Sequence, residues 1–297
     1  STDQMTADMV GIALSPDGER GYYIPVGHDS GKQLPLKQVL DALRGPLTNP
    51  NIPKYAHNAK YDLIIMQRYG IDVTPITFDT MIAEWVYDPG SQALGLKNLV
   101  RDRLNIRMTE IKELIGTGKK AITMSAVPIE RAAPYAAADA VFTHQLVDKL
   151  RIDLVNESLI SLFETIEMPL VPVLADMERT GVLLDTDFLA QMSEQLQVQL
   201  QAVEQQIFAA GGMGPFNINS PKQLNDVLFG KLGLKVEGLR KTSHGYSTAA
   251  DVLDNLRGEH PIIELILQYR ELSKLKGTYV DALPALINPL TGRGHTS

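Results

Sequence analysis

The sequence predicts an α/β domain followed by a mainly helical one, in a chain of 297 residues. Strand-like and helix-like segments alternate up to about residue 152, which is typical of α/β architecture. Beyond about residue 155 the strand patterns nearly vanish, and long amphipathic helical patterns replace them. The chain is also longer than a usual single domain. We therefore expect two domains, 1–152 and 153–297.

The chain opens with two short strands and a turn. Apolar runs at 9–15 and 21–26 flank the polar turn at 16–18, which is typical of a β-hairpin. Apolar residues at helical spacing then predict a helix over 36–43. We expect the prolines from Pro46 onward to end this helix, because proline lacks the N–H that a helix needs.

Two helices and a strand are expected after this proline-rich stretch. The spacing of apolar residues predicts a helix over 58–69 and a strand at 76–78. A further helix begins at Met81, and either Asp79 or Thr80 can cap it, because both residue types accept hydrogen bonds from free backbone N–H groups.

The second half of the chain is dominated by one long helix. Its apolar stripe, stepping by three or four residues over 187–210, predicts a buried seam between two antiparallel helices. The stripe consists of Leu189, Met192, Leu196, Leu200, Val203 and Ile207. Gly211 and Gly212 should end the helix.

Shorter helices should follow the long one. Ser220 before Pro221 predicts the start of a helix, because serine caps and proline suits the first turn. A polar loop is expected over 235–246. Thr248 with Asp251 three residues later resembles a capping box for the next helix.

Composition narrows the classes of function. The chain has no cysteine, so any metal must bind carboxylates or histidines. His28, His57 and His144 lack the spacing of metal ligands, and Trp85 is expected in the core.

The net charge of −7 disfavours a protein that coats nucleic acid nonspecifically, although it allows a local basic groove. No apolar stretch approaches the length of a membrane span, so we expect a chain that is neither exported nor in a membrane.

Two pairs of polar residues share a spacing of four. Asn58 precedes Asp62, and Tyr135 precedes Asp139. On a helix, residues four apart lie on one face, so each pair can present a polar group and a carboxylate to one site. Carboxylates are the ligands that Mg²⁺ prefers. On spacing alone, surface caps and an ordinary helix-face tyrosine are the simpler explanation.

Longer runs carry a resemblance to a known family. HNAKYDL at 57–63, FDTM at 78–81 and YAAADA at 135–140 resemble the second and third motifs of the DEDD-type proofreading exonuclease of family A (polymerase I-type) bacterial DNA polymerases, with the family's connecting strand between them. Further runs resemble the start and end of that family's thumb. These are IEMPLVPVL with ERTGV over 166–182, YRELSKLKGTY over 269–279, and INPLTGRGHTS over 287–297.

The resemblance implies a fold and an exonuclease site. It implies an RNase H-like (DEDD) exonuclease domain followed by a helical polymerase thumb. Asp62 and Asp139 should be metal ligands, Tyr135 should position the hydrolytic water, and Asn58 should help hold the frayed primer end. The complete site should bind two Mg²⁺ or Mn²⁺ ions.

The resemblance also implies a DNA-binding face. Arg270 and Lys274 should touch the DNA backbone. The face along the duplex should be formed by Lys241, Thr242, Ser243, Ser247 and Thr248, together with Asn219 and Ser220. The expected partners are primer-template DNA and single-stranded 3′ ends, and we expect a monomer in the bacterial cytoplasm, associated with the nucleoid.

Departures from the family pattern limit what this chain alone should do. The family's first motif, an Asp-x-Glu strand, is expected immediately before Ser1, and the palm and fingers after Ser297. We therefore expect a DNA-directed DNA polymerase with 3′-5′ exonuclease, used in replication and repair, of which this chain is a piece with no polymerase site and an impaired exonuclease. A non-catalytic DNA-binding module and a free-standing DEDD exonuclease with a helical accessory domain remain alternatives.

Overall fold

The computed structural model describes residues 3–212, 214–243 and 245–296. They form two compact units. The first unit runs to Thr180 and also includes Thr296, and the second runs from Gly181 to His295. Ser297, the last residue of the expected thumb, lies outside the described residues. The functional boundary expected at about residue 152 stays a prediction.

Two pairs of strands belong to the first unit. β1 (Gly11–Leu14) and β2 (Tyr22–Pro25) are antiparallel, which confirms the expected hairpin. β3 (Lys54–Ala56) runs parallel to β4 (Ile76–Asp79). The sequence predicted β4 but not β3, because β3 is only three residues long and follows a stretch rich in proline.

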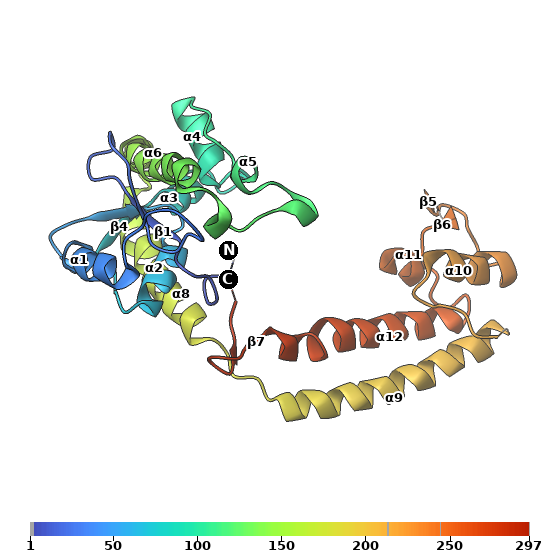
Figure 1. Cartoon of the computed structure of the whole chain (residues 1–297). Helices are drawn as coiled ribbons and strands as arrows, with labels where there is room; N and C mark the ends of the chain where they lie inside the picture. The colour runs from blue at the N-terminus through green and yellow to red at the C-terminus, as the bar shows by residue number, and fades with distance from the viewer. Residues whose placement is uncertain (1–2, 213, 244, 297) are drawn as a thin grey trace. The chain divides into compact units, whose positions relative to one another are not determined.

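Helices surround these strands (Figure 1). They are α1 (Leu36–Thr48), α2 (Ala59–Arg68), α3 (Thr80–Tyr87), α4 (Leu96–Leu104), α5 (Ile111–Ile115), α6 (Ile129–Asn156), α7 (Ile160–Leu162) and α8 (Met168–Thr180), with short 3₁₀ turns η1 (Gly118–Lys120) and η2 (Met124–Ala126) and the π-helical η3 (Phe163–Glu167). The long α6 contacts β1, β2 and β3. Within the described ranges no single helix has the length and apolar character to span a membrane; one bent pair, α6 with 160–180, meets both criteria with a bend of 119°.

α1 corrects one expectation about proline. The helix continues past Pro46 to Thr48 instead of ending there. Proline removes only one intrahelical hydrogen bond, and two contacts compensate at this end. Leu47 packs against the buried cluster around Leu40, and the Thr48 hydroxyl donates to the Arg44 carbonyl at 2.8 Å.

Aromatic packing fixes β4 in the main core. The rings of Phe78 and Phe163 lie 4.7 Å apart between centroids, and both side chains are fully buried. Leu146 and Leu150 of α6 belong to the same cluster. The end of β4 is therefore held rigidly against α6. Trp85 is not part of this core, contrary to expectation: α3 turns Ala83 inward and leaves Trp85 45% exposed.

Among its described residues, the second unit is mainly helical and has two small hairpins. Its elements are α9 (Thr186–Gly211), α10 (Pro221–Asn225), η4 (Asp226–Lys231), β5 (Lys241–Thr242), β6 (Gly245–Tyr246), α11 (Ala250–Asn255), α12 (Ile262–Lys274), η5 (Leu275–Val280), η6 (Leu283–Leu286), β7 (Ile287–Asn288) and β8 (Arg293–Gly294). The long helix expected over 187–210 is α9, and it ends where Gly212 adopts a left-handed conformation with φ of 62°. The polar loop expected over 235–246 contains the β5–β6 hairpin.

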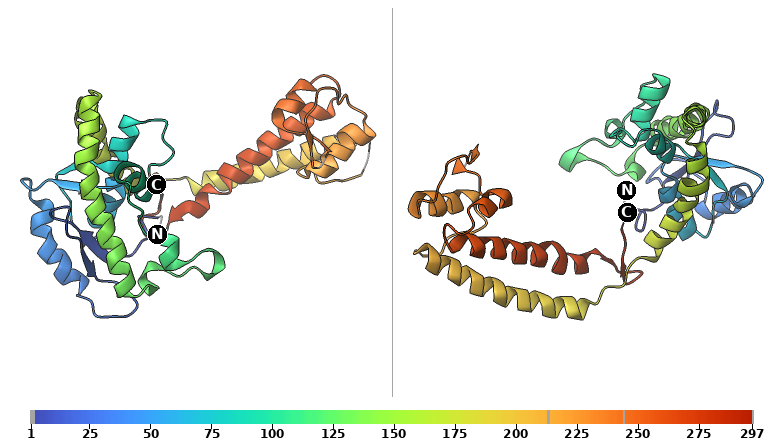
Figure 2. Two further views of the ribbon diagram at one scale, coloured as in Figure 1. Left: turned by 90° about the horizontal axis from the view of Figure 1, so that it is seen from above. Right: turned by 180° about the vertical axis from the view of Figure 1, so that it is seen from behind.

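α9 and α12 form the expected antiparallel pair. They lie side by side in every view (Figures 1 and 2). Val203 and Ile207, near the end of α9, share a buried cluster with Ile262 at the start of α12. Ser193, near the start of α9, donates a hydrogen bond to Asp281, which follows α12, at 2.7 Å. The apolar stripe is therefore the seam between the two helices.

The two caps expected in this unit have different outcomes. Ser220 caps α10 and accepts a hydrogen bond from the Gln223 backbone N–H, as expected. The expected capping box of Thr248 with Asp251 is wrong, because α11 starts after Ala249 without a side-chain cap. Thr248 is instead buried and accepts hydrogen bonds from a guanidinium group described below.

Candidate active site

Asp79 organises the backbone at the end of β4. Its buried carboxylate accepts hydrogen bonds from the backbone N–H groups of Asn58 at 3.1 Å and Ala59 at 2.6 Å. It also caps α3, accepting from the Met81 N–H at 2.8 Å. This confirms Asp79, rather than Thr80, as the cap. One carboxylate thus fixes where α2 and α3 begin, although burial raises the pKa of Asp79.

Asn58 does not stand on a helix, which corrects the interpretation of its spacing. Its backbone is left-handed, with φ of 63°, and it precedes α2. Asparagine tolerates this conformation better than most residues. Asp62 lies in the first turn of α2, so the two residues are not one helical turn apart on a shared face. The chain enters α2 through a tight turn that Asp79 secures.

Asp62 is a carboxylate in an unfavourable environment. Desolvation by the surrounding protein, and then the nearby charge of Asp79, raise the pKa of Asp62 to about 7. The side chain nevertheless exposes much of its surface, so solvent reaches the carboxylate and screens part of this effect. A nearby cation would stabilise the ionised form of the Asp62 carboxylate.

Tyr135 and Asp139 lie one turn apart on α6, as the sequence predicts. Burial, followed by the charges of Asp139 and Glu110, raises the pKa of Tyr135 to about 12. The phenol is therefore protonated at neutral pH and can donate a hydrogen bond. Burial also raises the pKa of Asp139, and this outweighs the opposing effect of the neighbouring Lys97.

Lys97 is a residue of this site that sequence reasoning missed. It lies in the first turn of α4, and its ammonium group bonds the Asp139 carboxylate. The same ammonium lies 4.2 Å from the centroid of the Tyr135 ring. A signal was present in the sequence, because a lysine in the first turn of a helix opposes the helix dipole and so indicates an anionic partner.

His57 lies just before the turn that leads into α2. Its Nδ1 lies 2.9 Å from the Thr80 hydroxyl oxygen. Burial, and then the charge of Lys97, lower the pKa of His57 to about 4. His57 is followed by α2, which carries Asp62 in its first turn.

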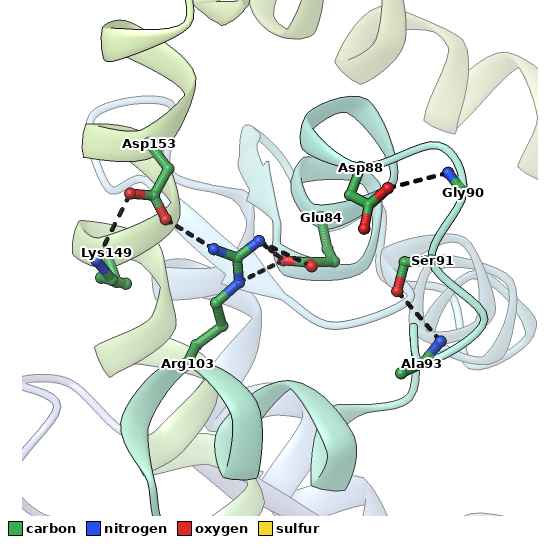
Figure 3. Close-up of polar contacts among 8 residues, drawn as sticks. All are labelled: Glu84, Asp88, Gly90, Ser91, Ala93, Arg103, Lys149 and Asp153. Atoms are coloured by element: carbon green, nitrogen blue, oxygen red, sulfur yellow. Dashed lines mark hydrogen bonds and ion pairs between the residues drawn. The ribbon is translucent and has the colours of Figure 1, made fainter.

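An ion-pair network positions α4 against α6 (Figure 3). Arg103 of α4 donates to both carboxylate oxygens of Glu84 on α3, at 2.8 and 2.9 Å. It also donates to Asp153 on α6 at 3.1 Å. All three side chains are largely buried. The helix that carries Lys97 is therefore fixed relative to the helix that carries Asp139.

The side chains fit part of a metal site. Asp62 and Asp139 are the donor type that Mg²⁺ takes, and Mg²⁺ commonly binds one or two carboxylates with water and substrate phosphate completing its shell. Over the residues that the structure describes, no group of three or more histidine, aspartate or glutamate side chains is arranged to hold an ion. These residues would therefore supply a minority of the ligands of two ions.

Three candidate DNA-binding residues lie in the β5–β6 hairpin of the second unit. Lys241 and Thr242 form β5, with the Lys241 ammonium 5.6 Å from the Tyr246 ring centroid, and Ser243 follows in the turn. The side chain of Asn225 in α10 donates to the Tyr246 carbonyl at 2.7 Å. The hairpin is thereby tied to the helix that Ser220 caps.

The neighbouring turn and loop are also ordered by hydrogen bonds. The backbone N–H of Asn219 donates to the side-chain oxygen of Asn217 at 2.9 Å. The Ser247 hydroxyl accepts from the Ala249 N–H at 3.3 Å. These contacts shape the backbone, and a contact of Asn219 or Ser247 with DNA stays a prediction.

Arg270 and Lys274 differ in their surroundings. The Arg270 guanidinium donates to the carbonyl and hydroxyl oxygens of Thr248, and burial lowers the pKa of Arg270. Arg270 therefore holds the loop before α11 onto α12. Lys274 lies one turn later on α12 and is exposed.

Both halves of the chain match known protein families. Residues 1–154 match the model of the 3′-5′ exonuclease family, and residues 186–297 match DNA polymerase family A. The chain is 45% identical to DNA polymerase I of Chloroflexus aurantiacus over 303 residues, covering all of this chain and 32% of that protein. It is 40% identical to DNA polymerase I of Synechocystis sp. over 299 residues, covering all of this chain and 30% of that protein.

A solved structure is similar over nearly the whole chain. This is the POL domain of Pol1 from M. smegmatis in complex with DNA primer-template and dNTP, with a TM-score of 0.77 and 27% identity. The match covers 98% of this chain and 46% of that chain. The chain spans about a third of the length of the two curated relatives. It therefore belongs to the DNA polymerase I type of family A polymerases, with its first half in the 3′-5′ exonuclease family.

Proposed function

We propose that this chain carries the proofreading exonuclease domain and the thumb of a longer DNA polymerase that extends primers and excises mispaired 3′ ends. The site on α6 carries the proposal. There Tyr135 and Asp139 both contact Lys97, in the unit that matches the 3′-5′ exonuclease family. The match of 186–297 to DNA polymerase family A argues against a free-standing exonuclease.

The finer assignment is an RNase H-like domain of the DEDD type over 1–152 and a thumb over 153–297. The parallel β3–β4 pair, the hairpin and the flanking helices support the first part. The spans of the two family matches, 1–154 and 186–297, support this order of domains.

In the proposed exonuclease, each side chain has a separate task. Asp62 and Asp139 would hold Mg²⁺ or Mn²⁺, two ions in the complete site, and bound metal supplies an activated water and stabilises charge on the phosphate. Tyr135 keeps its proton, so it orients the attacking water without acting as a base. Asn58 stands at the left-handed turn before α2, where its side chain would hold the frayed end of the primer.

The selectivity of this site has a physical source in the substrate. Only a 3′ end that has separated from its template can enter an exonuclease site, and unpairing costs less free energy at a mismatch. Mispaired ends therefore reach the site more often than paired ones.

The second unit would grip the primer-template duplex. Lys274 and Lys241 are exposed cations suited to phosphates, and Asn219, Ser220, Ser243 and Thr242 of the same unit offer polar groups. Phosphate contacts fix the position of a protein on DNA without reading sequence, as a polymerase requires. The solved relative holds a DNA primer-template, which supports this assignment.

A test of the proposal measures the polarity and metal dependence of cleavage. We expect a longer form of the protein, carrying the Asp-x-Glu strand that the resemblance places before Ser1, to release label from a 3′-labelled single strand in Mg²⁺. A 5′-labelled strand should shorten progressively from its other end. Release of the 5′ label first, or cleavage that does not need a divalent ion, would contradict the proposal.

One observation favours a second function for this chain by itself. The Asp139 carboxylate is already bound by Lys97, and the described side chains supply few metal ligands. The isolated chain would then bind DNA without cleaving it. Tight duplex binding together with no nucleotide release from any single strand would support this second function.

A further inference from the structure

The ammonium group of Lys97 is enclosed between two proposed catalytic side chains. It bonds Oδ1 of Asp139 and lies 4.2 Å from the Tyr135 ring centroid. Only 16% of the Lys97 side chain and 31% of the Asp139 side chain are exposed. Water therefore screens this pair less than it screens a surface ion pair. Asp139 therefore already has a cationic partner within the protein.

Lys97 is held in this position by its helix. The Arg103 network binds α4 to α3 and to α6, as Figure 3 shows. A lysine on such a fixed helix loses less conformational entropy on pairing than one on a mobile loop. The ion pair between Lys97 and Asp139 is thus a built feature of the unit.

From this geometry we infer that Lys97 is a resident counter-cation that competes with a divalent metal ion for Asp139. The inference rests on the proposed function, in which Asp139 is a metal ligand. Both cations need the same carboxylate, and two positive charges a few ångströms apart repel each other. A metal ion can bind Asp139 fully only when the ammonium group moves away. Until then Lys97 keeps Asp139 and Tyr135 oriented on α6.

The effect of removing Lys97 on metal affinity distinguishes competition with the metal from structural support of Asp139. If Lys97 only oriented Asp139 as a ligand, its removal would weaken metal binding, because an unoriented carboxylate binds less well. If Lys97 competes with the metal, its removal strengthens binding. Metal affinity measured without DNA reports this difference, independently of hydrolysis.

The test is isothermal titration calorimetry of the whole chain with MnCl₂. We expect Lys97→Met to bind Mn²⁺ at least about fivefold more tightly than the wild type, because a competing positive charge is removed. Lys149→Met is the matched control. Lys149 is also paired with an aspartate, Asp153, and lies on α6 away from Tyr135 and Asp139, so its removal should leave the affinity unchanged.

Three results would overturn the inference. These are equal or weaker Mn²⁺ binding by Lys97→Met, no Mn²⁺ binding by any variant, and a gain that persists in Lys97→Met/Asp139→Asn. Circular dichroism confirms that each variant is folded, and Lys97→Gln removes the same positive charge if Lys97→Met does not fold. Hydrolysis assays judge the proposed function separately: metal-dependent release of nucleotides with unchanged Mn²⁺ affinity in Lys97→Met would refute the competition and leave the exonuclease standing.

Discussion

The carboxylate of Asp79 accepts a hydrogen bond from the backbone N–H of Ala59 at 2.6 Å, so the last residue of β4 fixes the first residue of α2. Asp79→Ala would leave this buried N–H and those near the start of α3 without their acceptor. We expect the free energy of unfolding in urea to fall by about 2–4 kcal/mol. Asp41→Ala, which removes an exposed partner of Lys37, should change it by less than about 0.5 kcal/mol. A similar loss in both variants would count against the role of Asp79.

The network around Arg103 gives a second prediction about stability. Arg103→Met would leave Glu84 and Asp153 as poorly solvated carboxylates without their common partner. We expect a loss of about 3–5 kcal/mol in the free energy of unfolding, measured by urea denaturation. Arg101→Met removes an exposed pair with Asp102 and should cost less than about 1 kcal/mol. Equal effects of the two substitutions would mean that the buried network contributes no more than a surface pair.

His57 should make stability depend on pH. Its pKa falls from 6.5 to about 4 on folding, so the unfolded chain binds a proton that the folded chain does not. The contribution of neutral His57 to the free energy of unfolding is fully present above pH 6.5, and it is lost as the pH falls toward 4. Between pH 7 and pH 5 we expect the wild type to lose about 1–2 kcal/mol more free energy of unfolding than His57→Gln. Identical pH dependence of the two proteins would show that His57 stays protonatable in the folded chain.

Lys274 should contribute to duplex binding as a single phosphate contact. Lys274→Ala should weaken binding to a fluorescent primer-template, measured by anisotropy. It should also reduce the slope of log affinity against log salt by about 0.9. Affinity for a single strand should change less, because Lys274 belongs to the proposed duplex face. Lys37→Ala, an exposed lysine of the first unit, is the control. An unchanged slope in Lys274→Ala would remove Lys274 from the DNA-binding face.

The sequence predicted the elements whose patterns are local. The stripe of α9, the Ser220 cap and the β1–β2 hairpin each depend on residues that are neighbours in the chain. The spacing of Tyr135 and Asp139 also predicted that they lie one turn apart on a helix, because both residues belong to one continuous helix.

The expectations that proved wrong depended on tertiary contacts. The Thr248 cap is replaced by bonds from Arg270, which is 22 residues away. Asn58 leaves the helical spacing because Asp79, 21 residues later, binds its backbone. Lys97, which was missed, reaches Asp139 across 42 residues: its place in a first helical turn indicates an anionic partner but does not say which one.

The most direct test of the account compares two aspartates of α6. In a longer form that carries the expected Asp-x-Glu strand, the measured quantity is the rate of nucleotide release from a 3′-labelled single strand in Mg²⁺. We predict that Asp139→Asn lowers this rate at least about a hundredfold, because a metal ligand contributes several kcal/mol to the transition state. Asp148→Asn, an exposed aspartate of the same helix, should leave the rate unchanged. Wild-type rates in Asp139→Asn would contradict the assignment of the site.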